Sequence, residues 1–88
     1  MDMTQLAERW TGGRRRREDY RLGMAAYNAG DYRQAVYRFC RLAEHDSLHG
    51  RLARFYVAQA HRRLGLEAMG RGEFPTAIAQ FQSACRYH

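Results

Sequence analysis

Lysine is absent from this 88-residue chain, and proline occurs only once. All fifteen basic residues are arginine, and they exceed the nine acidic residues to give a formal net charge of +6. Runs rich in Val, Ile and Thr are also absent, whereas Ala, Arg, Leu, Gln and Glu, which favour helix, are abundant. This composition argues against a β-sheet protein and predicts an all-α fold.

The chain has no long apolar run and only two cysteines, Cys40 and Cys85. No stretch approaches the roughly 18 apolar residues that are needed to span a bilayer. Residues 1–10 carry Asp2 and Glu8, whereas a secretory leader begins with basic residues followed by an apolar run. We therefore expect a cytoplasmic protein with reduced thiols that serve as packing residues. The alternative is a mature extracellular product that has lost its leader.

The size of the chain limits it to one domain, because separate cores need roughly 50 to 200 residues each. A domain this short buries a modest fraction of its surface, so we expect a partner or oligomerisation to stabilise it further. Arginine forms bidentate contacts with carboxylates and phosphates, although codon bias in a GC-rich genome would also explain the missing lysine. The net charge fits nucleic acid, an anionic membrane or an acidic protein, and does not choose among them.

An internal repeat is the strongest pattern in the sequence. Residues 21–39 align with residues 63–81 when the sequence is shifted by 42 positions. The matched residues, in order, are Arg21-Leu22-Gly23 with Arg63-Leu64-Gly65, Ala26 with Ala68, Gly30-Asp31-Tyr32 with Gly72-Glu73-Phe74, Ala35-Val36 with Ala77-Ile78, and Phe39 with Phe81.

Each repeat unit has the pattern of a helical hairpin. In its first helix, a Leu-Gly pair removes one side chain so that a second helix can approach closely. A Gly-acid-aromatic turn follows, in which the glycine suits the helix end and the acid suits the start of the next helix. In the second helix, an alanine and an aromatic ring four positions apart share one face. Pro75 falls in the first turn of a helix, where its missing N–H costs little, and Ser47 is a candidate N-cap.

The two segments RLGMAAYNAGDYRQAVYRFCRLA and RLGLEAMGRGEFPTAIAQFQSAC resemble the tetratricopeptide repeat. The resemblance covers the chain from about Asp19 to its C-terminus and implies a short α-solenoid of two hairpin units with lengthened helices. Asp19 and His61 stand where the family has a large apolar residue, and Ala26 and Ala68 stand where it prefers a larger one. The period is 42 residues instead of about 34, so the helices gain about two turns.

The pattern predicts helices near residues 2–10, 15–29, 32–45, 48–70 and 74–87. Thr11-Gly12-Gly13 is expected to be a flexible joint. The chain then divides into a helical arm at residues 1–13 and a repeat region at residues 14–88. The two repeats cover about residues 15–46 and 48–88.

Catalytic patterns are missing, since the sequence has no diagnostic pair of acids, no phosphate-binding loop and no Ser-His-Asp set. We therefore expect a non-enzymatic protein without a cofactor. His45 and His49 are four positions apart, and Cys40 is the nearest further ligand. A helix break is expected between the two histidines, so we predict no metal site.

Four consecutive arginines, Arg14, Arg15, Arg16 and Arg17, are the sharpest charge feature. Near a helix start they oppose the helix dipole, and Glu18 and the residue after it offset this in part. The cluster fits a solvated flank, a surface for an acidic protein, or a nucleic-acid site. A nucleic-acid site is the less favoured interpretation, because helix packing better explains the aromatic residues that such a site would expose, namely Tyr20, Tyr27, Tyr32 and Tyr37.

The resemblance to the tetratricopeptide repeat also implies a peptide groove lined by the first helix of each unit. In such a groove an asparagine at the place of Asn28 holds the backbone of the peptide, and Arg17 and Arg62 favour an acidic ligand. Simple packing of these side chains against one another is the alternative. The implied lining residues are Arg17, Tyr20, Met24, Tyr27, Asn28, Gln59, Arg62, Leu66 and Met69.

The ends of the repeat array suggest the function. Repeat arrays need polar terminal units, because each unit buries its apolar face on the next one. The last helix presents Ile78, Phe81 and Cys85 with nothing after it in the sequence given. Near the other end, Met3, Leu6 and Trp10 form an apolar stripe. The leading hypothesis is a scaffold that self-associates head-to-tail into a ring or filament, with the N-terminal stripe as plug and the last helix as socket. An adaptor or chaperone for an extended acidic peptide is the second hypothesis, and nucleic-acid binding is the third.

Overall fold

The computed structural model describes residues 3–45 and 47–87, with the side chains of those from residue 14 onward. It contains four helices, which are α1 (Met3–Asn28), α2 (Tyr32–Leu42), α3 (Leu48–Gly70) and α4 (Phe74–Arg86). No strand occurs in this described part of the chain, which confirms the all-α prediction. None of the described helices is both long and apolar enough to cross a membrane.

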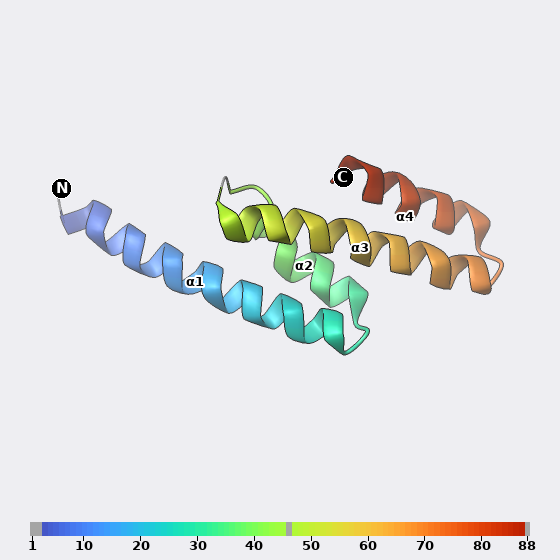
Figure 1. The fold of residues 1–88 in the computed structure, drawn as a ribbon, viewed down its shortest axis with the longest axis horizontal. Coiled ribbons are helices and arrows are strands. Elements are labelled where there is room, and N and C mark those ends of the chain that lie inside the picture. Colours follow the sequence, from blue (N-terminus) through green and yellow to red (C-terminus); the bar gives the residue numbers. More distant parts are fainter. Residues whose placement is uncertain (1–2, 46, 88) are drawn as a thin grey trace.

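The two helix pairs form two hairpins that lie side by side (Figure 1). In the first hairpin α1 packs on α2, and in the second α3 packs on α4. α3 lies in the middle and contacts the other three helices, whereas α4 packs on α3 alone within the described residues. The molecule is therefore elongated, with extents of 55 × 23 × 16 Å.

The predicted joint at residues 11–13 is wrong, because α1 continues through it without a break. The sequence predicts separate helices at residues 2–10 and 15–29, and the structure has one helix from Met3 to Asn28. A glycine inside a helix costs only about 0.5–1 kcal/mol relative to alanine, and no proline forces a break here. The short separate N-terminal helix therefore does not exist as predicted.

The two hairpin turns are equivalent in three dimensions. Gly30 and Gly72 end α1 and α3 with positive φ angles of 80° and 75°, a backbone conformation that favours glycine. In the first turn the Asp31 N–H donates to the carbonyl of Ala26 at 2.9 Å. The matching bond in the second turn runs from the residue after Gly72 to Ala68 at 2.8 Å. Both pairs of bonding partners are 42 residues apart, so the structure reproduces the sequence repeat.

The helix starts follow local chemistry. Asp31 is the N-cap of α2, and its side chain accepts a hydrogen bond from the Gln34 N–H at 3.3 Å. Ser47 is the N-cap of α3 and accepts from the Gly50 N–H at 3.0 Å, as predicted. Pro75 lies in the first turn of α4, also as predicted. These starts are set by residues within one turn of them, which is why the sequence indicates them well.

The helix glycines of each unit make room for an aromatic ring. A Cβ on Gly23 would lie 2.8 Å from the ring of Phe39, and a Cβ on Gly65 would lie 2.6 Å from the ring of Phe81. The alanines four positions before the two rings are buried, with exposures of 0% for Ala35 and 2% for Ala77. The predicted close approach of the paired helices is confirmed, and it is the ring of the second helix that fills the gap.

The second hairpin is shifted along the first. Tyr20 of α1 contacts His49 of α3 with ring centroids 5.0 Å apart, and Tyr27 contacts Tyr56 at 5.2 Å. Each α1 ring therefore lies level with an α3 residue 29 positions later, whereas the sequence repeat is 42. The difference of 13 residues displaces the second unit by about 20 Å along the helix axis, at about 1.5 Å per residue.

Candidate interaction surface on the second hairpin

The last helix carries an apolar stripe on its exposed side. Phe74, Ile78, Phe81 and Cys85 recur at steps of four, three and four residues, so they lie along one face of α4. Phe74 is 59% exposed, Ile78 is 56% exposed, and Cys85 is also exposed. Phe81 is half-buried, because its ring leans against Gly65 of α3. We call these four residues the α4 stripe.

The equivalent stripe on α2 is covered by α3. Phe39 is fully buried, with the ring of Tyr56 stacked on it at 5.4 Å and an interplanar angle of 16°. Ala43 is 6% exposed, and Arg54 of α3 donates to its carbonyl at 2.7 Å. The other two members of this stripe are Tyr32 and Val36, which pack on the same core. The two stripes are therefore alike in sequence position, and they differ in whether a helix lies on them.

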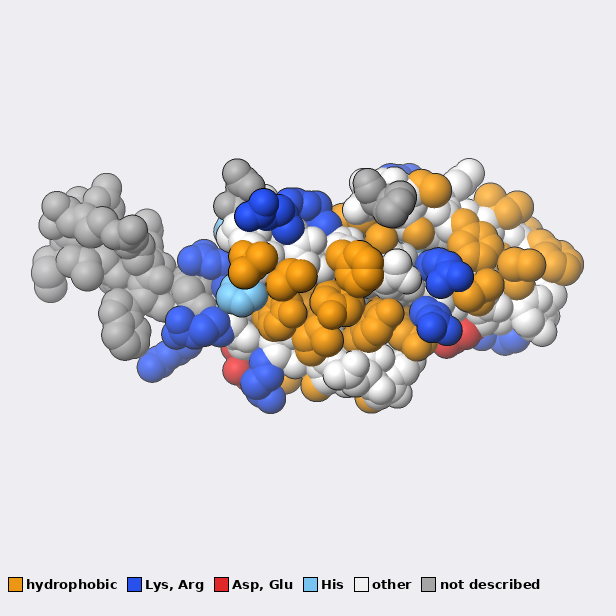
Figure 2. Space-filling model, viewed as in Figure 1, with side chains coloured by type: hydrophobic (Ala, Val, Ile, Leu, Met, Phe, Trp, Pro, Cys, Tyr) orange, Lys and Arg blue, Asp and Glu red, His pale blue; other side chains and the backbone are white. Residues whose placement is uncertain are grey.

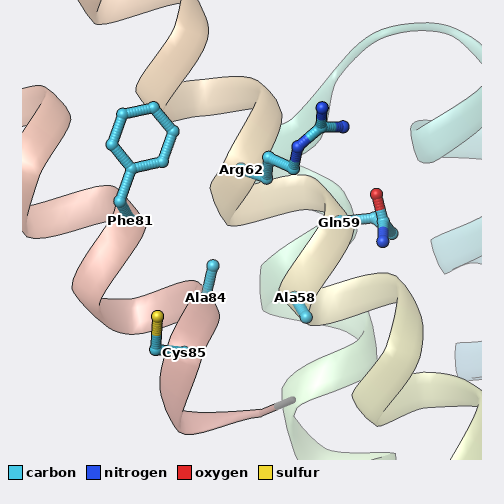
Figure 3. Close-up of a pocket in the computed structure, with 6 residues that line it drawn as sticks. All are labelled: Ala58, Gln59, Arg62, Phe81, Ala84 and Cys85. Carbon is cyan, nitrogen blue, oxygen red and sulfur yellow. The ribbon is translucent and has the colours of Figure 1, made fainter.

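An open pocket of about 300 Å³ adjoins the α4 stripe between α3 and α4 (Figure 3). Phe81 forms one end of it, and its ring lies toward α3 (Figure 3). The mouth is mostly apolar, with one charged residue, Arg62. Its lining residues are Ala58, Gln59, Arg62, Phe81, Ala84 and Cys85.

Two substitutions between the repeats open this pocket. In the first hairpin Tyr20 packs edge-on against Phe39 with ring centroids 5.8 Å apart, and Leu42 is buried with 1% exposure. The residues 42 positions later are Arg62 and Ala84, which line the pocket. An arginine extends toward solvent and an alanine is small, so the space that a ring and a leucine fill in the first hairpin stays open in the second.

A polar pair closes the other side of the second hairpin. His61 Nδ1 lies 2.7 Å from the Gln80 side-chain oxygen, and its ring stacks on Tyr87 at 6.2 Å. The equivalent pair in the first hairpin is Asp19 and Arg38, which form an ion pair at 3.9 Å. Asp19 and His61, the polar residues at apolar positions of the resembled family, are thus satisfied by partners from the second helix of their own unit.

The predicted socket is brought together by the structure, since Ile78, Phe81 and Cys85 all belong to the α4 stripe. The predicted plug residues, Met3, Leu6 and Trp10, lie outside the residues whose side chains are described. The packing interpretation of the cysteines is wrong, because Cys85 and Cys40 are both exposed. Each lies on a helix side that α3 does not cover. The sequence analysis omitted Phe74, although its repeat relation to the core residue Tyr32 could have indicated it.

The predicted peptide groove is divided by the shift between the hairpins. Its α1 members lie level with the N-terminal half of α3, where Tyr20 and Tyr27 contact His49 and Tyr56. Its α3 members, residues 59–69, lie beyond the C-terminal end of α1 and alongside α4. Figure 2 shows hydrophobic side chains over α1 and α3, and again over the α3–α4 end. The two halves therefore line two successive surfaces and do not face each other.

The arginine cluster occupies the middle of a helix. Arg14 to Arg17 lie inside α1, so the expected opposition to a helix N-terminus does not arise. Successive helical residues point about 100° apart, so four in a row spread around the axis and do not form a one-sided patch. One turn later, Arg21 hydrogen-bonds Glu18 and thereby holds the pKa of that carboxyl below its ordinary value. The predicted packing holds for three of the tyrosines, but Tyr37 is 55% exposed beside Arg38 and Arg41.

The histidines considered for a metal site lie apart in function. His45 is exposed in the turn before α3, and His49 stacks on Tyr20. Among the described residues, no three His, Cys, Asp or Glu side chains are grouped closely enough to hold a metal ion.

The geometry defines a class of protein, namely an all-α chain of two like hairpins with one apolar face left uncovered. Comparisons with models of known families, with curated proteins and with solved structures give no match. The functional argument therefore depends on the α4 stripe and its covered counterpart on α2.

Proposed function

We propose that this chain is a non-enzymatic protein–protein interaction scaffold of tetratricopeptide type, and that it self-associates through its α3–α4 end. The repeat in sequence, the two matching turns and the matching glycine–ring pairs support two units of one kind. A unit of this kind buries its apolar face on a neighbour. Association through that face follows from the same principle.

One observation carries the proposal. Phe39 and Phe81 are equivalent residues with the same glycine contact, yet Phe39 is fully buried under Tyr56 and Phe81 borders an open pocket. Burying a large apolar side chain stabilises by roughly 1.5–3 kcal/mol. The stripe that contains Phe81 therefore has a free-energy incentive to acquire the cover that α3 gives to Phe39.

We expect the Ile78→Glu variant to be monomeric while the unchanged chain forms a larger species. A carboxylate in the centre of the α4 stripe would lose its water on association, which disfavours the assembly. Molar mass from light scattering checks this, with 10.3 kDa as the monomer value. Ala79→Glu is the matched control, because Ala79 is exposed on another side of α4. A monomeric unchanged chain would overturn self-association.

Binding of an extended acidic peptide is the second candidate function. It is favoured by the apolar side chains exposed beside Arg62 on α3, since Leu66 is 43% and Met69 is 47% exposed. Arg62→Ala is expected to weaken binding of an acidic peptide in a fluorescence-polarisation titration. Because α1 ends before the level of Arg62, Asn28→Ala should have a separate and additive effect. Unchanged affinity in both variants would argue against this candidate.

A further inference from the structure

We propose that the occupant of the α4 stripe is α4 of a second copy, lying antiparallel across a two-fold axis. This inference rests on the proposed self-association and specifies its geometry. The assembly is then a closed dimer, and the ring or filament of the head-to-tail hypothesis does not form. The kind of contact continues the interface that α2 already makes with α3, transferred by the 42-residue repeat to the next uncovered face.

The stripe is complementary to itself. Its members are symmetric about the midpoint between residues 79 and 80, so an antiparallel partner places Phe74 opposite Cys85 and Ile78 opposite Phe81. Phe74 protrudes with 59% exposure at one end, and the open pocket lies at the other end beside Cys85. A two-fold axis brings each protruding ring to the pocket of the other copy. Each pocket then receives the large apolar group that its small alanine lacks.

Charge argues against the head-to-tail arrangement. The α3 residues that cover α2 include Tyr56, Val57 and Ala60. The residues 42 positions earlier, on the α1 surface that would cover another copy's α4, are Arg14, Arg15 and Glu18, and all three are exposed. Placing them on an apolar stripe would desolvate charges without a partner there, since no stripe member is charged. The stripe of a second copy carries no such cost.

The expected dimer is weak. α4 has 13 residues and is therefore about 20 Å long. One pair of such helices buries less than the roughly 800 Å² per partner of a standard stable interface. Association should therefore depend strongly on concentration, and a covalent trap is the suitable test.

The test places a thiol where the partner's Cys85 should lie. In the full chain, Cys40→Ser removes the other thiol, and Phe74→Cys adds one at the opposite end of the stripe. Air oxidation with copper phenanthroline should then give a covalent dimer of twice the chain mass. Its formation should be at least about tenfold faster than with Thr76→Cys in the same background, because facing thiols have a raised effective concentration. Without either added cysteine, the two Cys85 thiols lie about 16 Å apart along the axis and should not link.

The possible outcomes separate the two proposals. A fast dimer with Phe74→Cys supports the antiparallel pair. Fast linking through Cys85 alone shows a parallel pair and overturns it. If light scattering finds an assembly but Phe74→Cys links no faster than Thr76→Cys, the two-fold geometry fails and self-association stands. If every variant is monomeric and unlinked, both proposals fail.

Discussion

The glycine–phenylalanine pairs show how one residue type meets two environments. Gly23 and Gly65 each lie against a ring of the following helix, closer than any Cβ would allow. Phe39 is held between Tyr20 and Tyr56, so it has no space in which to move. Phe81 borders the open pocket and can turn into it. The same contact is therefore rigid in the first hairpin and adjustable in the second.

Gly23→Ala should destabilise the protein by about 1–3 kcal/mol, the range for overpacking a filled core. Gly65→Ala should cost clearly less, because Phe81 has room to yield. Gly70→Ala is the matched control, since nothing lies within 4 Å of its added Cβ. The free energy of unfolding from urea titrations measures all three. An equal loss in the Gly23 and Gly65 variants would contradict the difference in confinement.

At the scale of the element, the start of α3 is defined most sharply. Ser47 caps the helix through the Gly50 N–H, and Gly50 itself is buried against the preceding turn. A Cβ on Gly50 would lie 1.8 Å from the carbonyl oxygen of His45, so only glycine fits there. The cap and the glycine together fix where the long central helix begins.

Ser47→Ala should lower the free energy of unfolding by about 1 kcal/mol, because it leaves an N–H of the first turn of α3 without its partner. Ser83→Ala serves as the control, since Ser83 lies inside α4, where alanine is the better helix former. Thermal unfolding followed by circular dichroism compares the two variants. A larger loss for Ser83→Ala would refute the role assigned to the cap.

The whole molecule is a rod, since its radius of gyration is 15.2 Å. A compact domain of this length would have about 12 Å. The elongation follows from the 23-residue α3, whose two ends serve different hairpins. Its N-terminal half packs beside α1, and its C-terminal half packs beside α4.

Small-angle X-ray scattering of monomeric Ile78→Glu should therefore give a radius of gyration near 15 Å. The reason is that α3 separates the two hairpins by about 20 Å along its axis. A value near 12 Å would show a compact bundle, with the hairpins level with each other. Ala79→Glu at high concentration should give a larger value, as expected for an assembly.

The sequence by itself determined the local structure. Helix ends, the Ser47 cap, the turn glycines and the glycine–ring pairs depend on residues within a turn or within one repeat, so pattern and period reveal them. It failed at residues 11–13, where glycines suggested a joint, because helix-breaking tendency is weak and neighbouring residues override it. It also misplaced Tyr37 and both cysteines, whose exposure depends on which helix lies opposite.

Only the tertiary structure decided how the two repeats sit on each other. Equivalent residues have the same local pattern, so sequence cannot tell that Phe39 is covered and Phe81 is not. The shift of 13 residues arises from packing between α1 and α3, through contacts such as Tyr20 with His49. That shift divides the expected groove and leaves the α4 stripe and its pocket open, because burial depends on the position of a neighbouring helix and not on the residue alone.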